Sequence, residues 1–356
     1  KGINSYNLHT AQGSVHIATP SFEKTIATVY RGGGPKGIIG SDKESFDRFL
    51  LGRAIEEGAH HEPVKIDRIE YVNSRPILYS DGKEIGKADL VVGAFGTNSS
   101  GFEMFEKMGF GYRRPDLIKA AITEINVDAG FMEEHFGNSI HLFLLPMKNI
   151  KFAALIPKGT YLTLCILGKD MSPNTVSDFL DHEVVRKVLP KDTGYELKCR
   201  CFPKMNVKAP KRPYTDRLVL CGDAGSTRLF KDGLGAAYVM GKAAATTAVF
   251  HGVGHKDFKE NYYPVYKSII VDNRFGKYLY SITDLYRNYS ILTKGMLAIV
   301  RAEQKNAKDA KRLSSILWDM FTGNERYKKI FGTAVSLPMH LDLWKEFGKI
   351  IVRRQL

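Results

Sequence analysis

One carboxylate and two glycines near residue 225 have the types and the spacing to hold a polar ligand. The apolar run Leu218–Cys221 has the length of a buried strand, and Gly222-Asp223 ends it. This order puts the Asp223 carboxylate at the carboxyl edge of a sheet. Gly233 and Gly235 then let the backbone come close to a ligand at the start of a helix rich in small residues. An aspartate beside open helix N–H groups suits a sugar-like polyol joined to an electron-rich ring edge, although an ordinary α/β turn has the same spacing.

The stretch Arg217–Tyr238 resembles the second flavin-binding signature of FAD-dependent reductases and hydroxylases, the geranylgeranyl reductase and aromatic hydroxylase superfamily (group A flavoproteins). In that family the Gly-Asp carboxylate holds the ribityl chain, and the following loop presents N–H groups to the pyrimidine edge of the flavin. The resemblance implies that Asp223 is the ribityl ligand. Phe230 stands where the family usually has a proline. The cofactor-binding residues implied at this motif are Gly222, Asp223, Gly233, Leu234 and Gly235.

A helix predicted over residues 45–58 carries a second resemblance. Its apolar residues follow helical spacing, and Gly58 is placed to end it. The segment is similar to the family's Arg-x-x-Phe/Leu-Asp helix, where the first basic residue reaches the FAD phosphates or ribose. That residue is Lys43 here, which keeps the charge and loses the arginine fork, and a solvent-exposed lysine is the alternative. By the same resemblance, Val64 contacts the adenine through its backbone.

The strand predicted before Gly96 carries a residue that differs between the hydroxylases and the reductases of the family. Ala88–Gly96 resembles the Asp-Gly strand of the hydroxylases and implies that Gly96 lies near the cofactor. Hydroxylases have an aspartate just before the final glycine, and this chain has Phe95, which favours a reductase. The halogenase branch has a Trp-x-Trp-x-Ile-Pro motif. The tryptophans of this chain, Trp318 and Trp344, lie far from that place in the sequence, which disfavours halogenation.

A hairpin near residue 157 resembles the substrate-sheet motif of the reductases. That motif has an aromatic residue, a tryptophan two residues later, Phe-Pro and a Gly-x-Gly. Phe152, Pro157 and Gly168 match it, and Ala154 replaces the tryptophan. The resemblance implies that Phe152 and Pro157 contact the substrate. The losses put a geranylgeranyl substrate in doubt without excluding a lipid-like one, and an ordinary hairpin with a Pro-Lys-Gly turn fits the same residues.

The family begins with a strand and a Gly-x-Gly-x-x-Gly turn, whose helix N-terminus receives the FAD pyrophosphate. No such turn precedes Ser45, because Pro35 follows the glycines at residues 32–34 and no buried strand leads into them. The resemblance covers residues 1 to about 255 and starts just past that unit. We expect the unit to lie upstream of Lys1 rather than to be lost, since tight FAD binding should fail without it.

The order of predicted elements indicates an α/β (α+β) protein. It implies an FAD-binding Rossmann-like domain of the hydroxylase type, discontinuous in sequence, with an inserted antiparallel β-sheet substrate domain and a helical C-terminus. We expect residues 1–100 and 206–252 to form the two parts of the FAD-binding domain, the first without its N-terminal βαβ unit. Residues 101–205 would form the β-rich substrate domain and 253–356 the helical region. A hairpin is expected within residues 1–35, with alternating stretches at 13–18 and 24–30, and a helix over 177–188.

The chain has 356 residues and a net charge of +14, and from Lys256 onward 19 Lys/Arg residues face 10 Asp/Glu residues. No nucleic-acid-binding motif accompanies them, so we expect no nucleic-acid partner. A solvated surface and a membrane-surface contact are alternatives, and the amphipathic basic tail at 341–354 fits the second. The sequence has no membrane-spanning run, no signal peptide and no metal-ligand spacing. Four cysteines without redox spacing indicate a reducing compartment, so the predicted location is cytoplasmic, with peripheral attachment to a membrane as an alternative.

These observations predict an FAD-dependent oxidoreductase similar to geranylgeranyl reductase. It would transfer hydride between flavin and a small apolar substrate, isoprenoid- or quinone-like, with electrons from NAD(P)H or an electron-carrier protein. The alternatives are an FAD-dependent NAD(P)H monooxygenase and a non-catalytic membrane-surface or scaffold protein that keeps the fold. The catalytic residues stay unknown from the sequence. Lys231, His141 and Tyr238 are polar candidates to face the ring, each with a structural role as its alternative.

Overall fold

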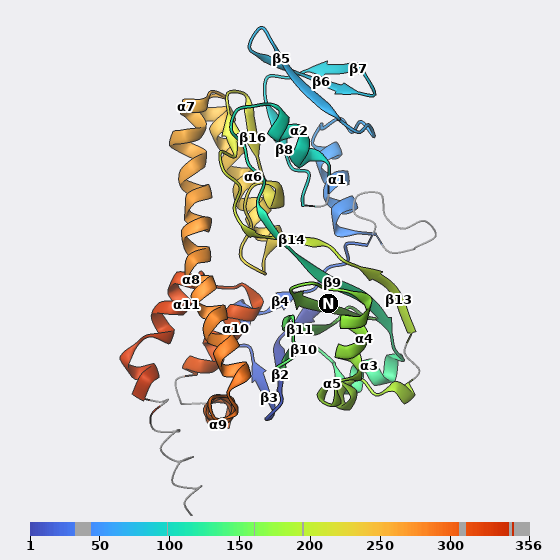
Figure 1. Cartoon of the computed structure of the whole chain (residues 1–356), viewed down its shortest axis with the longest axis vertical. Helices are drawn as coiled ribbons and strands as arrows, with labels where there is room; N and C mark the ends of the chain where they lie inside the picture. The colour runs from blue at the N-terminus through green and yellow to red at the C-terminus, as the bar shows by residue number, and fades with distance from the viewer. Residues whose placement is uncertain are drawn as a thin grey trace, which may run out of the picture.

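The computed structural model describes residues 1–32, 44–97, 99–159, 161–193, 196–305, 311–341 and 344. The chain forms two lobes, and the long helix α8 (Tyr263–Asn288) runs from one to the other (Figure 1). One lobe contains a large sheet with helices on both faces. The other contains two small sheets with helices α1, α2 and α6. The structure is mixed α/β with a helical C-terminal region, as the sequence predicts.

The large sheet organises the first lobe. Among the described residues it has eight strands, with the path β13-β9-β12-β11-β10-β2-β3 and with β14 also paired to β9. Neighbours along this path are antiparallel except β10 and β2, which are parallel. The strands are β2 (Ser5–Thr10), β3 (Gly13–Ala18), β9 (Asp116–Asn126), β10 (Ser139–Leu144), β11 (Ile150–Pro157), β12 (Tyr161–Gly168), β13 (Glu196–Cys201) and β14 (Lys204–Lys208).

The partner of β2 was not predicted from the sequence. β2 pairs residue by residue with β10, from Ser5 opposite Ser139 to Thr10 opposite Leu144. The assignment of residues 1–100 to the first part of an FAD-binding domain stays a prediction. A hairpin does form within residues 1–35, but β3 pairs with β2 rather than with the predicted strand over 24–30. Among the described residues, Ile26–Ala27 (β4) pairs with Gly2–Ile3 (β1). An alternating pattern predicts a strand but does not name its partner, and this partner lies far along the chain.

Helices cover both faces of the large sheet. On one face, α3 (Ala129–His135), α4 (Pro173–Asp181) and α5 (Glu183–Val188) enclose a core that contains Phe179 and Leu155, both with no exposed surface. The helix expected over 177–188 is thus two helices, because His182 is extended and caps the second one. The other face packs against the C-terminal helices.

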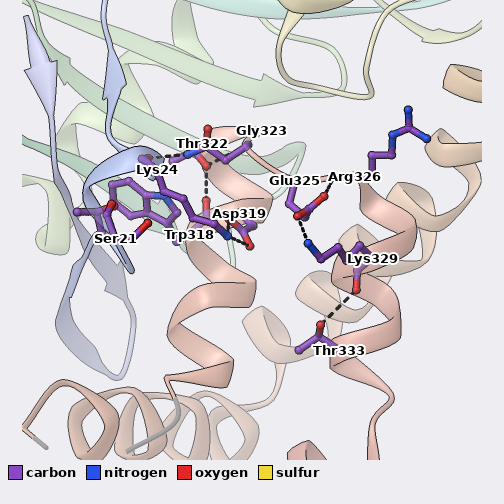
Figure 2. Close-up of polar contacts among 12 residues, drawn as sticks. Ser21, Lys24, Trp318, Asp319, Thr322, Gly323, Glu325, Arg326, Lys329 and Thr333 are labelled. Carbon is purple, nitrogen blue, oxygen red and sulfur yellow. Dashed lines mark hydrogen bonds and ion pairs between the residues drawn. The ribbon is translucent and has the colours of Figure 1, made fainter. Parts of the chain in front are cut away.

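The C-terminal helices are α8, α9 (Ser290–Lys305), α10 (Arg312–Thr322) and α11 (Tyr327–Ala334). Their core with the sheet extends from Ile3 to Met339 and includes Trp318, which is 1% exposed. Figure 2 shows how α10 reaches the N-terminal segment: Lys24 Nζ lies 2.6 and 2.7 Å from the carboxylate oxygens of Asp319, and Trp318 Nε1 donates to the Lys24 carbonyl at 3.2 Å. The first and last parts of the described chain therefore share one core.

The second lobe contains the Gly-Asp motif. Its central pair is β8 (Val91–Gly93), parallel to β16 (Leu218–Leu220), with β15 (Tyr214–Thr215) beside β16. Within the described residues β8 pairs on one side only. Helix α6 (Gly233–Phe250) follows β16, and α1 (Phe46–Glu56) and α2 (Gly101–Lys107) complete the lobe with the antiparallel strands β5 (Arg68–Val72), β6 (Arg75–Ser80) and β7 (Lys83–Lys87).

Candidate functional site

The turn after β16 places Asp223 at the end of a central strand. Leu218, Val219 and Leu220 have no exposed surface, as expected for a strand covered on both faces. Gly222 has a φ of +61°, which glycine adopts without strain, and a Cβ there would lie 3.5 Å from Ala237. The sequence predicted this strand and turn, and the structure has both.

The Asp223 carboxylate is half-buried and lies beside the start of α6. A Cβ on Gly233 would lie 3.6 Å from Asp223 Oδ1 and 3.7 Å from Thr227 Oγ1, so the glycine brings helix backbone against the carboxylate. Burial raises the pKa of Asp223, while a hydrogen bond from Thr227 and the charge of Arg31 act in the opposite direction. A carboxylate that is only partly compensated within the protein is suited to accept hydrogen bonds from a ligand.

Arg31 is a site residue that the sequence analysis missed. Its guanidinium donates two hydrogen bonds to Asp47, at 2.9 and 2.7 Å, and Asp47 lies in the first turn of α1. Asp47 therefore holds the Arg31 guanidinium in place, and the charge of Asp223 also acts on this guanidinium. No local pattern links residues 31, 47 and 223, so only the folded chain brings them together.

The start of α6 presents backbone donors next to this carboxylate. Asp232 caps the helix from a left-handed conformation and accepts a hydrogen bond from Gly235 N at 3.0 Å. A Cβ on Gly235 would lie 2.4 Å from the Asp232 carboxylate, so the cap requires glycine there. Gly233 and Leu234 are exposed, and amides in the first turn of a helix have no acceptor within the helix. The site thus combines an acceptor with outward-facing donors.

The other residues implied by the resemblance are more scattered. Gly96 follows β8 with a φ of +67° and open space around it. Phe95, which stands in place of the hydroxylase aspartate, packs against Phe102 and Phe105 with ring centroids 5.3 and 5.1 Å apart. Val64 is exposed in the connection between α1 and β5. Lys43 lies outside the described residues.

Phe152 and Pro157 lie on opposite faces of the large sheet. They are five residues apart on β11, and successive strand residues point to opposite faces of the sheet. Phe152 is 2% exposed and belongs to the core beneath the C-terminal helices, whereas Leu162, the partner of Pro157, belongs to the core beneath α3 to α5. Of the two, Phe152 is on the face that meets the Gly-Asp loop, since its ring lies 6.3 Å from that of Phe230.

The three polar candidates lie in three different places. His141 is on the opposite face of the sheet from Phe152, in contact with His9 at 3.1 Å, and burial lowers its pKa to about 3. Tyr238 is 68% exposed and lines a cavity of about 240 Å³ between α6 and α8. Of the three, Lys231 lies at the Phe152 face of the large sheet, with its ammonium 5.2 Å from the centre of the Phe152 ring.

No protein-family profile and no curated protein matches the chain, but solved structures do. The halogenase PltM has a TM-score of 0.61 at 15% identity, with 96% of this chain and 71% of that chain covered. A geranylgeranyl bacteriochlorophyll reductase-like protein from Thermoplasma acidophilum has a TM-score of 0.60 at 14% identity, covering 94% and 82%. A flavoprotein/dehydrogenase from Cytophaga hutchinsonii has a TM-score of 0.54 at 15% identity, covering 100% and 83%.

These similarities confirm the fold that the sequence predicts. The chain has the fold of these proteins, which include halogenases, a reductase-like protein and a flavoprotein/dehydrogenase. A variant of PltM is solved in complex with FAD. Helices in the described part of this chain are all too short or too polar to cross a membrane.

Proposed function

We propose that this protein is an FAD-dependent oxidoreductase that acts as a reductase, transferring hydride between flavin and a largely apolar substrate. The observation that carries the proposal is the half-buried Asp223 carboxylate beside the exposed first turn of α6, on the fold of FAD-dependent proteins. NAD(P)H or an electron-carrier protein is the proposed electron source. A membrane-surface contact stays a prediction from the basic C-terminal region.

The residues present fit the flavin end of FAD. Asp223 accepts hydrogen bonds as a polyol chain requires, and Gly233 leaves no side chain between this carboxylate and a ligand. The amides of Gly233 and Leu234 lie in the first turn of α6, where they have no acceptor within the helix and can donate to an electron-rich ring edge. When bound, the flavin supplies the hydride chemistry, and the protein contributes binding, orientation and exclusion of water.

Phe95 supports a reductase over a monooxygenase. The hydroxylase signature has an aspartate at this position, and here a half-buried ring packs against Phe102 and Phe105 instead. No polar group replaces that aspartate at this position of the chain. Halogenases share the fold, but their branch has a Trp-x-Trp-x-Ile-Pro motif, and both tryptophans of this chain lie after residue 310, far from its place.

The test is flavin binding by the protein expressed from its complete gene. We expect a flavin absorption spectrum after purification or after addition of FAD. Asp223→Ala should weaken FAD binding by about ten- to a hundredfold, since hydrogen bonds to a charged group contribute about 1.5–3 kcal/mol. Asp178→Ala, at an exposed position on α4, is the matched control and should bind FAD as the parent does.

Each alternative has its own outcome in this test. A colourless protein that does not bind added FAD would overturn the proposal. Oxygen consumed in a fixed ratio to NAD(P)H in the presence of an aromatic substrate would identify a monooxygenase. Unchanged cellular activity of the Asp223→Ala variant would support a scaffold.

A further inference from the structure

Lys231 is a half-buried cation without an anion. It lies between Phe230 and the N-cap Asp232, and the base of its side chain lies near the loop after α10, where a Cβ on Gly323 would lie 3.8 Å from Lys231 Cβ. Its ammonium sits 5.2 Å from the centre of the Phe152 ring. Among the described residues it forms no hydrogen bond and no salt bridge. An ammonium that is partly removed from water without an anion is unfavourable, so a ligand that supplies an anion would be stabilised there.

The charged groups around Lys231 do not supply an anion for its ammonium. Asp232 is engaged at the cap of α6 with Gly235 N. Arg228 is turned to the loop after α10, where it donates to the Gly323 carbonyl at 2.8 Å and lies 4.1 Å from the centre of the Tyr327 ring. Burial lowers the pKa of Lys231 to about 8, with Cys165 acting in the opposite direction and Arg228 in the same one.

A strip of the large sheet continues from Lys231. Residues opposite each other in an antiparallel pair share a face, so Cys165 on β12 shares the Phe152 face with its partner Ala154. Ile156 on β11 and Ile122 on β9 belong to the same face, and both are half-buried, as Cys165 is. This surface, which we call the Cys165 strip (Ile122, Ile156 and Cys165), is apolar and is not fully covered by the protein.

Two polar groups border the Cys165 strip. The Thr163 hydroxyl, opposite Ile156, is buried and has no hydrogen-bond partner among the described residues. Lys158, directly after the end of β11, donates to the Val29 carbonyl at 2.9 Å. Lys158 and Lys231 both favour the ionised form of the Cys165 thiol, although burial raises the pKa of this thiol overall. The thiol is thus neutral near pH 7 and does not neutralise Lys231.

We propose that Lys231 binds the anionic group of a ligand, a carboxylate or phosphate, whose apolar body lies along the Cys165 strip. Identifying this ligand as the substrate rests on the proposed function. The substrate is then an amphiphile with a negative head group rather than a neutral isoprenoid or quinone. Phe152 lies buried beneath the head group, and the buried Thr163 hydroxyl lies under the edge of the strip, opposite Ile156.

The experiment compares two fluorescent probes with the same apolar body, cis-parinaric acid and its uncharged methyl ester. Lys231→Met should weaken binding of the acid at pH 7 at least about tenfold and change binding of the ester less than about twofold. Lys242→Met, at an exposed position on α6, is the matched control and should bind both probes as the parent does. Binding of the acid by the parent should fall as the pH rises past about 8 and should show no such fall in Lys231→Met.

Other outcomes overturn the inference. Equal loss of the acid and the ester in Lys231→Met, with an unchanged melting temperature, would show that Lys231 only shapes the surface. If Lys231→Met changes FAD affinity but not binding of the acid, the ammonium serves the cofactor. If the protein binds no FAD while binding of the acid depends on Lys231, the anion site stands and the proposed oxidoreductase function fails.

Discussion

At the scale of the residue, Asp223 links binding to stability. Its pKa is raised from the ordinary 3.8 because the carboxylate is half-buried. The folded chain therefore holds this proton more tightly than the unfolded chain does. Folding stability then falls as the pH rises from about 4 through the raised pKa, and the loss is complete above it. The ionised Asp223 carboxylate, which is proposed to bind the flavin, thus lowers the folding stability of the free protein at neutral pH.

This argument predicts that Asp223→Asn stabilises the protein. The amide removes the charge and keeps an oxygen that accepts from Thr227. We expect the melting temperature at pH 7, without flavin, to rise by roughly 1 to 3 °C, and the difference to vanish near pH 3. Scanning calorimetry at both pH values measures it. A variant that melts below the parent at pH 7 would show that the carboxylate is stabilising there.

Residues of the site differ in how far the sequence predicts them. Asp223, Gly233 and Gly235 follow from a local pattern of strand, turn and glycines, and the structure brings them together. Arg31 was missed because its position depends on Asp47, 16 residues further on, and on the fold around both. Lys231 was named from the sequence, but its lack of an anion is visible only once Phe152 and Arg228 are placed.

At the scale of the element, the end of β12 depends on one glycine. A Cβ on Gly168 would lie 1.7 Å from the carbonyl oxygen of Asn149, which also accepts from Lys169 N at 2.8 Å. We expect Gly168→Ala to destabilise the protein by about 3 kcal/mol, because backbone rather than a side-chain tip must move. Urea unfolding measures this change. Gly86→Ala on β7, where a Cβ meets nothing within 4 Å, is the control and should change stability far less.

Elements with strong local signals were predicted best. Helix α1 begins after Ser45, whose hydroxyl accepts from Arg48 N, and Gly58 follows its end with a φ of +95°. The pairing of β2 with β10 was not predicted, because it joins residues that are 134 positions apart from Ser5 to Ser139. Such pairing is set by the packing of the whole sheet rather than by its own residues.

At the scale of the whole molecule, the C-terminal helices hold the N-terminal segment through Lys24 and Asp319. The Lys24 side chain is 32% exposed and that of Asp319 is 10% exposed, so this ion pair is partly shielded from water. In Figure 2 it lies beside Trp318, on the side of α10 that faces the N-terminal segment. We therefore expect loss of either partner to weaken the shared core.

A double-mutant cycle tests this link. Lys24→Met and Asp319→Leu should each destabilise the protein by about 1–2 kcal/mol, and the double variant should lose less than the sum, with a coupling of about 1 kcal/mol. Urea unfolding followed by circular dichroism is the measurement. Additive losses would show that the two charges do not interact in solution. The exposed pair Lys187 and Glu183 on α5 is the comparison and should show weaker coupling.

The burial of Trp318 also has an optical consequence. The sequence holds two tryptophans, and in the structure one is 1% exposed while Trp344 is 75% exposed. Their emission should differ in wavelength and in access to aqueous quenchers. With Trp344 replaced by phenylalanine, the remaining indole reports on the contact between α10 and the N-terminal segment without any attached dye. Because indole emission overlaps flavin absorption, the same residue becomes an energy donor whose dimming records cofactor binding.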